Sequence, residues 1–186
     1  LVDSAVALWL GTDQVEGKPE GWMLYSVAQL AAKNFGLEGG EAKVNKVLMD
    51  LFNTAQGIAL TCDAGSGNID SLRQIVREIV RLLSVPLLQH LLYYMSENNV
   101  DYVEMYAVAL IPQTAGCDLG TFDILEAALF EGFDRDVTID YDLLSNFGKS
   151  LRCLRMTCDD LGDTRNASDE LKSLVATLCT EIEVGY

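Results

Sequence analysis

Residues 100–106 carry the side chains whose types and spacing best suit metal chemistry. Asp101 and Glu104 lie three positions apart and share one face of a helix, and Tyr102 and Tyr106 lie four apart on the adjacent face. Carboxylate and phenolate oxygens together suit ferric iron (Fe3+), whose high charge stabilises a deprotonated ligand. The alternative is structural: both tyrosines pack in the core while the two acids act as charges at a helix N-terminus.

One helix face offers two side chains at most, so a specific site needs ligands from a second element. Two regions are available for that part, the His90–Tyr94 segment and the acidic stretch around Tyr141. A solvated loop explains the acidic stretch adequately, and its aspartates are Asp134, Asp136, Asp140 and Asp142. We therefore expect a hard trivalent or divalent cation to bind through oxygen ligands, with Asp101, Tyr102, Glu104 and Tyr106 contributing.

The sequence lacks residues that the common catalytic and metal-binding sites of helical proteins require. His90 is the sole histidine and sits in a strongly apolar segment, which favours a buried histidine over a Ser-His-Asp or Cys-His centre. Leu87 stands where a di-iron bundle needs Glu, and no phosphate-loop motif occurs. An EF-hand beginning at Asp134 would have Ile139 in place of its glycine and Ser145 in place of its glutamate. The sequence predicts a protein that is not an enzyme.

The net charge limits the classes of molecule that the protein can bind. Thirteen Lys and Arg against 28 Asp and Glu give a net charge of −15 and a pI of about 4.2. This field repels nucleic acid and anionic lipid and attracts cations, although solubility alone also explains it. The longest apolar stretch, from Ile79 to Met95, contains Arg81, Pro86 and His90. It falls short of the roughly 20 apolar residues that span a bilayer, so we expect no direct membrane span.

The cysteines indicate disulfides rather than a zinc site. Cys153 and Cys158 lie on one predicted helix with Cα atoms about 8 Å apart, beyond disulfide reach, so at least one bridge is expected between distant cysteines. Asn166-Ala167-Ser168 is an N-glycosylation sequon. Together these features predict an extracellular, cell-surface or periplasmic protein. Because no initiator Met opens the chain, either a signal peptide has been removed or the chain is a fragment.

Apolar spacing of three and four predicts helices along the whole chain. The expected helices cover residues 2–10, 22–35, 41–61, 71–97 with a kink or break at Pro86, 100–115, 121–133, 141–161 and 170–183. The fold class is all-α, an irregular bundle of about seven to eight helices in a single domain over 1–186. Three Cys-Asp steps at predicted helix ends form a weak internal repeat or a chance recurrence: 61–63, 116–118 and 157–159.

The first third of the chain, over 1–55, resembles a known family. A Val2-to-Gly11 segment containing Trp9 and Gly11 is followed by Leu24-Tyr25-Ser26-Val27-Ala28-Gln29, Ala32-Lys33-Asn34-Phe35-Gly36, Val44-Asn45 and Asp50-Leu51-Phe52-Asn53. This succession is similar to the low-iron-inducible iron-uptake domain of algae, also found in the diatom surface proteins called phytotransferrins. The resemblance implies an extracytosolic protein of a photosynthetic eukaryote that binds ferric iron, together with carbonate, for uptake. It assigns no ligand residue in this chain.

A second class of function stays open. A mean hydropathy of +0.17 in a chain of net charge −15 indicates contact surfaces for a protein partner or a second copy. On this interpretation the protein is a structural or assembly subunit with no specific ligand. A discrete oligomer without a specific metal would distinguish it from a cation-binding uptake protein.

Overall fold

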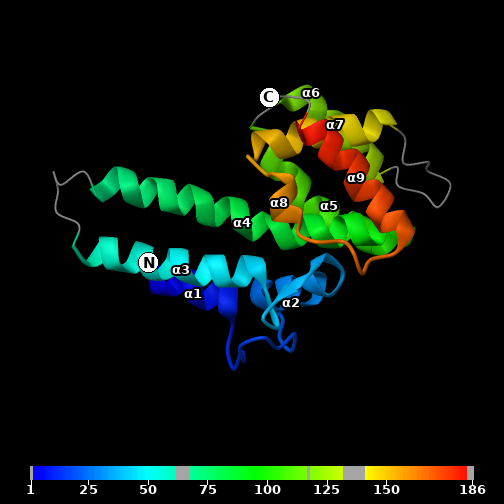
Figure 1. Cartoon of the computed structure of the whole chain (residues 1–186). Coiled ribbons are helices and arrows are strands. Elements are labelled where there is room, and N and C mark those ends of the chain that lie inside the picture. Colours follow the sequence, from blue (N-terminus) through cyan, green and yellow to red (C-terminus); the bar gives the residue numbers. More distant parts are fainter. Residues whose placement is uncertain (1, 62–67, 117, 132–140, 184–186) are drawn as a thin grey trace. The chain divides into compact units, whose positions relative to one another are not determined.

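A computed structural model of the chain describes residues 2–61, 68–116, 118–131 and 141–183 (Figure 1). The contacts group the chain into two compact units, Leu1–Pro86 (unit 1) and Leu87–Tyr186 (unit 2). The boundary falls inside the long helix α4 (Asn68–Ser96). Each unit has its own set of buried apolar side chains. The expectation of one folding domain over 1–186 remains a prediction about how cooperatively these units unfold.

Unit 1 is built on three mutually contacting helices, α1 (Val2–Leu10), α2 (Leu24–Phe35) and α3 (Lys43–Leu60). The helix α1 ends where predicted, at Gly11, whose backbone φ of +83° suits glycine. The Trp9 ring centroid lies 5.3 Å from that of Tyr25 and 5.4 Å from that of Phe52. Trp9 thereby joins the three helices, and its side chain is almost fully buried.

A short antiparallel hairpin connects α2 to α3. Its strands β1 (Leu37–Glu38) and β2 (Glu41–Ala42) pair Leu37 with Ala42 and Glu38 with Glu41. Gly39 and Gly40 form the turn, with φ of +63° and +87°, as a two-residue hairpin of this hand requires. Among the described residues this is the whole sheet content. The all-α prediction is confirmed.

The helix α4 begins three residues earlier than predicted and continues through Pro86. A break at that proline is therefore wrong. The missing N–H of proline costs one backbone hydrogen bond, but a long apolar helix tolerates this where tertiary packing holds it. Its buried residues on both sides of Pro86 include Val85 and Leu88.

Unit 2 continues from the last turns of α4 into shorter helices that contact one another. In chain order these are α5 (Val100–Leu110), the 3-10 helix η1 (Ile111–Thr114), α6 (Leu119–Glu126), the π-helix η2 (Ala127–Glu131), α7 (Tyr141–Cys153), α8 (Cys158–Leu161) and α9 (Asp169–Glu183). The predicted helix over 100–115 tightens to 3-10 geometry at Pro112. The helix predicted over 141–161 is interrupted: its two ends are helical, as α7 and α8, but the chain leaves helical geometry between them, where Arg155 has a φ of +58°.

The helices α7 and α9 pack closely at Gly148. A Cβ atom added there would lie 2.7 Å from Cβ of Glu181, closer than real Cβ atoms approach. One turn further along α7, Arg152 donates from Nη1 to the Glu181 carbonyl oxygen at 2.7 Å. Glycine at position 148 therefore permits a backbone approach that the arginine then holds in place.

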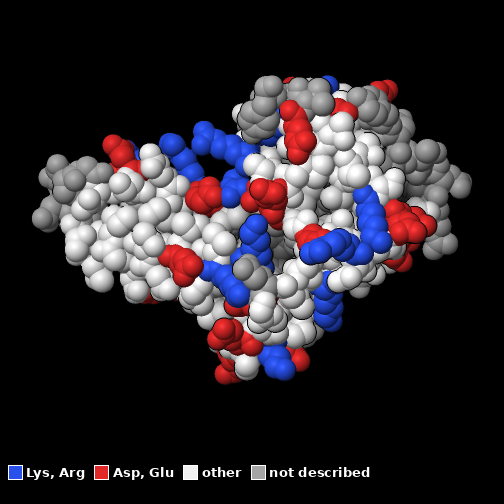
Figure 2. All heavy atoms as spheres, viewed as in Figure 1, with Lys and Arg blue, Asp and Glu red and all other residues white. Residues whose placement is uncertain are grey.

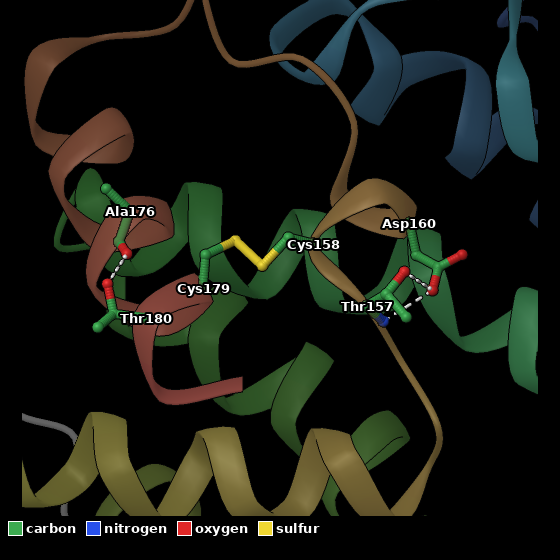
Figure 3. Close-up of a disulfide and its surroundings, with 6 residues drawn as sticks. All are labelled: Thr157, Cys158, Asp160, Ala176, Cys179 and Thr180. Carbon is green, nitrogen blue, oxygen red and sulfur yellow. Dashed lines mark hydrogen bonds between the residues drawn. A yellow bond between two sulfur atoms is a disulfide. The ribbon is translucent and has the colours of Figure 1, made fainter. Parts of the chain in front are cut away.

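A disulfide joins Cys158, the first residue of α8, to Cys179 in α9 (Figure 3). Their Cα atoms lie 5.5 Å apart and they are 21 positions apart in sequence. The prediction of a bridge between distant cysteines is confirmed, and Cys153, which is also disulfide-bonded, is not joined to Cys158. Cys62 and Cys117 lie outside the described residues.

The start of α8 also bears on the expected Cys-Asp repeat. Thr157 precedes α8 and forms a capping box with Asp160, with the Thr157 amide donating to the carboxylate at 2.8 Å (Figure 3). In a second copy, Asp118 caps α6 by accepting from the Gly120 amide at 3.1 Å. In both copies the segment lies at the start of a helix. The repeat hypothesis requires each segment to close a helix, so the hypothesis is wrong for these two copies.

Charged side chains of both signs are interspersed over the face shown in Figure 2. The net charge of −15 therefore does not gather there into one acidic patch. Within the ranges that the structure describes, no helix is long and apolar enough to cross a membrane.

Candidate metal centre

The three-residue turn 97–99 connects α4 to α5 and sets the position of the predicted ligands. The Asn98 and Asn99 amides donate to the carbonyl oxygens of Met95 and Tyr94, at 3.1 and 3.0 Å, and close the end of α4. The side chain of Asn99 then caps α5 by accepting from the Tyr102 amide. So short a connection brings the last turns of α4 against the first turns of α5.

The four predicted ligands differ in their surroundings. Asp101 and Glu104 are exposed, Tyr102 is 45% exposed, and Tyr106 is half-buried. Asp101 lines a polar surface pocket of about 540 Å³ at the α4–α5 turn, together with residues 97–100. The two carboxylates point into solvent-accessible space, as an ion entering from solvent requires.

The tyrosines of α5 lie against aromatic rings of α4. The Tyr94 ring centroid is 4.4 Å from that of Tyr102 and 5.7 Å from that of Tyr106, with both pairs of ring planes 12° apart. His90 stacks on Tyr106 at 4.8 Å, and Tyr93 meets Tyr94 edge-on at 5.0 Å. We call these five rings the aromatic cluster: His90, Tyr93, Tyr94, Tyr102 and Tyr106.

Two phenols of the aromatic cluster, those of Tyr94 and Tyr106, have raised pKa values. Burial, followed by the neighbouring Tyr94 and Tyr102 phenols, raises the pKa of Tyr106 to about 12. Burial also raises the pKa of Tyr94, with further contributions from Tyr102 and Tyr93. The phenol groups therefore lie near enough to repel one another as phenolates. A trivalent cation bound between them would reverse that repulsion.

Part of this arrangement could be expected from the sequence. The His90–Tyr94 segment was one of two regions predicted to complete the site, and the structure places it beside Tyr102 and Tyr106. His90 is buried, as predicted. Of the alternative region, Asp134, Asp136 and Asp140 lie outside the described residues, and Asp142 is exposed in the first turn of α7. The predicted segment also includes Tyr93, whose ring meets that of Tyr94.

The carboxylates do not form a metal site by themselves. Among the residues described, no three His, Cys, Asp or Glu side chains gather into a set that could hold a metal ion. Any ion at the aromatic cluster would therefore depend on phenolate oxygens, supported by Asp101 or Glu104. The assignment of these four residues as ligands stays a prediction.

Searches of protein-family models, curated proteins and solved structures found no match for this chain. The residues that carry the resemblance to the algal iron-uptake domain all lie in unit 1, whereas the aromatic cluster lies in unit 2. The resemblance therefore assigns no residue of the aromatic cluster.

Proposed function

We propose that the protein binds a hard cation, with ferric iron preferred, at the aromatic cluster, and that it serves iron uptake without catalysis. One observation carries the proposal: Tyr94 from α4 stacks against Tyr102 and Tyr106 from α5. Phenol groups from two helices are thereby brought together, which a single helix face cannot do. The acidic net charge raises the local concentration of cations around the site.

The test is a titration with ferric citrate, with and without bicarbonate, followed by visible absorbance. Phenolate ligation predicts a coloured charge-transfer band that saturates at one iron per chain. Because two or more phenols must ionise, binding should release protons and strengthen as pH rises from acid towards neutral. The bicarbonate arm tests the carbonate that the family resemblance implies.

The variant Tyr102→Phe/Tyr106→Phe should lose the band while its far-ultraviolet circular dichroism stays unchanged, since the phenyl rings keep their stacking. Tyr25→Phe is the matched control, because Tyr25 belongs to unit 1. If the double variant binds iron as tightly as the parent, or if the parent binds none, the assignment is wrong.

An extracytosolic location belongs to the same proposal. Structural disulfides persist in oxidising compartments, and Cys158–Cys179 is such a bridge. The sequon residue Asn166 is exposed in the turn between α8 and α9, where an oligosaccharide would find room. Expression in a secreting eukaryotic host should give a glycosidase-sensitive mass that Asn166→Gln abolishes.

The second candidate is an assembly subunit, and the exposed face of α5 favours it. Tyr102, Met105 and Val108 follow one another at helical spacing and are 45%, 49% and 52% exposed. A contacting protein or second copy would cover them. A discrete oligomer on a sizing column in the absence of metal, weakened by Met105→Glu, would support assembly over iron binding.

A further inference from the structure

A second cavity is formed by residues of unit 1, whereas the aromatic cluster belongs to unit 2. It has a volume of about 500 Å³, which is within the usual range for small-molecule sites. Three carboxylates and one ammonium line it, from Glu16, Glu41, Asp50 and Lys46. Three negative charges against one positive charge leave the lining at −2 when all four side chains are ionised.

Tyr25 is one of the residues that line this cavity, and its hydroxyl makes two hydrogen bonds. It donates to Oε1 of Glu41 at 2.5 Å and accepts from the Gly17 amide at 2.9 Å. Its ring is buried against Trp9, so only the hydroxyl edge can meet a ligand. Burial, the hydrogen bond to Glu41 and the charges of Glu41 and Glu16 raise the pKa of Tyr25 to about 12, although the Gly17 amide opposes this.

A buried amide fixes the two segments that carry the carboxylates. Gln29 is 3% exposed, and its Nε2 donates to the carbonyl oxygens of Gly17 at 3.0 Å and Gly40 at 2.8 Å. Its Oε1 accepts from the Ala42 amide at 2.9 Å. These bonds fix the backbone of Gly17, Gly40 and Ala42, which are the sequence neighbours of Glu16 and Glu41. The cavity is therefore preorganised, which lowers the cost of binding.

This region holds more acceptors than donors. Asn45, which is not part of the cavity lining, is fully buried and donates from Nδ2 to the Tyr25 carbonyl oxygen at 3.0 Å. Its Oδ1 has no hydrogen-bond partner within the described part of the chain. The acceptors that a ligand in the cavity can reach are therefore the three lining carboxylates, which a ligand with several N–H groups would satisfy.

The shape and polarity of the cavity separate organic from inorganic cations. The described carboxylates do not converge as a metal-ligand set, so a single metal ion would not satisfy them. Leu10 and Met49 supply apolar lining between the charges. A chain of methylene groups bearing separated ammonium groups matches both features, because it buries apolar surface and distributes its positive charge.

We propose that this cavity binds a short alkyl diamine, whose two ammonium groups pair with Glu41 and Asp50 while its methylene chain lies against Leu10 and Met49. The two positive charges of the ligand offset the net charge of the lining. This site is separate from the proposed iron site in both location and ligand class.

Isothermal titration calorimetry with 1,5-diaminopentane tests the proposal on the full chain. A saturable 1:1 isotherm is expected, with pentylamine binding at least about tenfold more weakly because it lacks one charge-assisted contact. Magnesium chloride carries the same charge as the diamine and should not compete at equal concentration. No saturable binding at millimolar diamine, or equal competition by magnesium, would overturn the proposal.

Variants localise the site. Asp50 is exposed on α3, so Asp50→Asn should leave the fold intact and weaken diamine binding about tenfold. Glu41→Gln should weaken diamine binding as well.

The matched control is Glu20→Gln. It removes one exposed carboxylate of the same unit outside the cavity lining and should have no effect on diamine binding. An unchanged affinity in Asp50→Asn would refute the site. An equal loss in Glu20→Gln would show that only net charge matters and would refute it as well. Tyr102→Phe/Tyr106→Phe should bind the diamine normally whether or not the iron proposal holds.

Discussion

The Tyr94 ring of α4 stacks on the Tyr102 ring of α5 with centroids 4.4 Å apart and planes 12° from parallel. This contact crosses the turn 97–99 and ties the end of one helix to the start of the next. Burial, followed by the charge of a neighbouring Tyr102 phenolate, raises the pKa of Tyr94. The same geometry can therefore act as a packing contact in the metal-free protein and as a ligand pair when a cation supplies compensating charge.

Alkaline pH should destabilise the fold. The folded-state pKa values of Tyr106 and Tyr25 are raised from 10.0 to about 12, so the neutral phenols are favoured in the folded protein. Their contribution to stability is fully present below pH 10 and is lost as pH rises towards 12. Tyrosinate absorbance should show a late-titrating fraction among the seven tyrosines. The midpoint temperature of thermal denaturation should fall across the same pH window.

The variant Tyr106→Phe should remove one phenol from the late-titrating fraction and leave the contribution of Tyr25. Titration of all tyrosines together near pH 10, with the circular dichroism still native, would contradict the burial of these two hydroxyls.

Two glycine substitutions should have opposite effects on stability. Gly148→Ala places a methyl group 2.7 Å from Glu181 Cβ and should destabilise the protein by about 1–3 kcal/mol through overpacking. Gly57→Ala, inside α3, meets no atom within 4 Å and should stabilise it by about 0.5–1 kcal/mol through helix propensity. Denaturant midpoints measure both. Equal, small effects would mean that α7 and α9 do not approach closely in solution.

The Cys158–Cys179 bridge should contribute substantially to the stability of unit 2. Its loop of 21 residues predicts a loss of about 3 kcal/mol when both cysteines become serine, mainly because the unfolded chain gains entropy. Chemical denaturation of the double variant gives the value. Peptide mapping without reductant should recover a Cys158–Cys179 peptide, and a Cys153–Cys158 peptide would contradict the structure.

The local features of this fold were predictable from the sequence, whereas features that depend on distant residues were not. The predicted end of the first helix at residue 10 and the predicted start of a helix at residue 100 both agree with the structure, and Gly11 and Asn99 at these two ends act within one turn. The separation of α7 from α8 depends on Arg155 adopting a positive φ, which its residue type disfavours and no local signal marks.

The two candidate sites show the same division. The ring contacts of the aromatic cluster follow from a three-residue turn, so the His90–Tyr94 segment could be named in advance as a neighbour of Tyr106. The cavity of unit 1 needs Glu16, Glu41 and Asp50 to meet across a loop, a hairpin and a helix. That meeting depends on hydrogen bonds of Gln29, a residue that the sequence presents only as one polar position in α2.

Unfolding should proceed in two steps, because each unit has a buried core of its own. Both tryptophans, Trp9 and Trp22, lie in unit 1, so tryptophan fluorescence follows that unit while far-ultraviolet circular dichroism follows both. Phe52→Ala removes a buried ring that contacts Trp9 and should cost about 3–5 kcal/mol. The fluorescence transition should then move to lower denaturant concentration and leave a later dichroism transition in place.

Phe147→Ala is the matched change in unit 2, where the ring is fully buried in α7. It should shift the later dichroism transition and leave the tryptophan transition unmoved. Reduction of the Cys158–Cys179 bridge should act in the same direction, since that bridge lies wholly within unit 2. If either phenylalanine variant moves both signals together by the same amount, α4 couples the two cores into one cooperative domain, and the sequence-based expectation of a single domain over 1–186 holds.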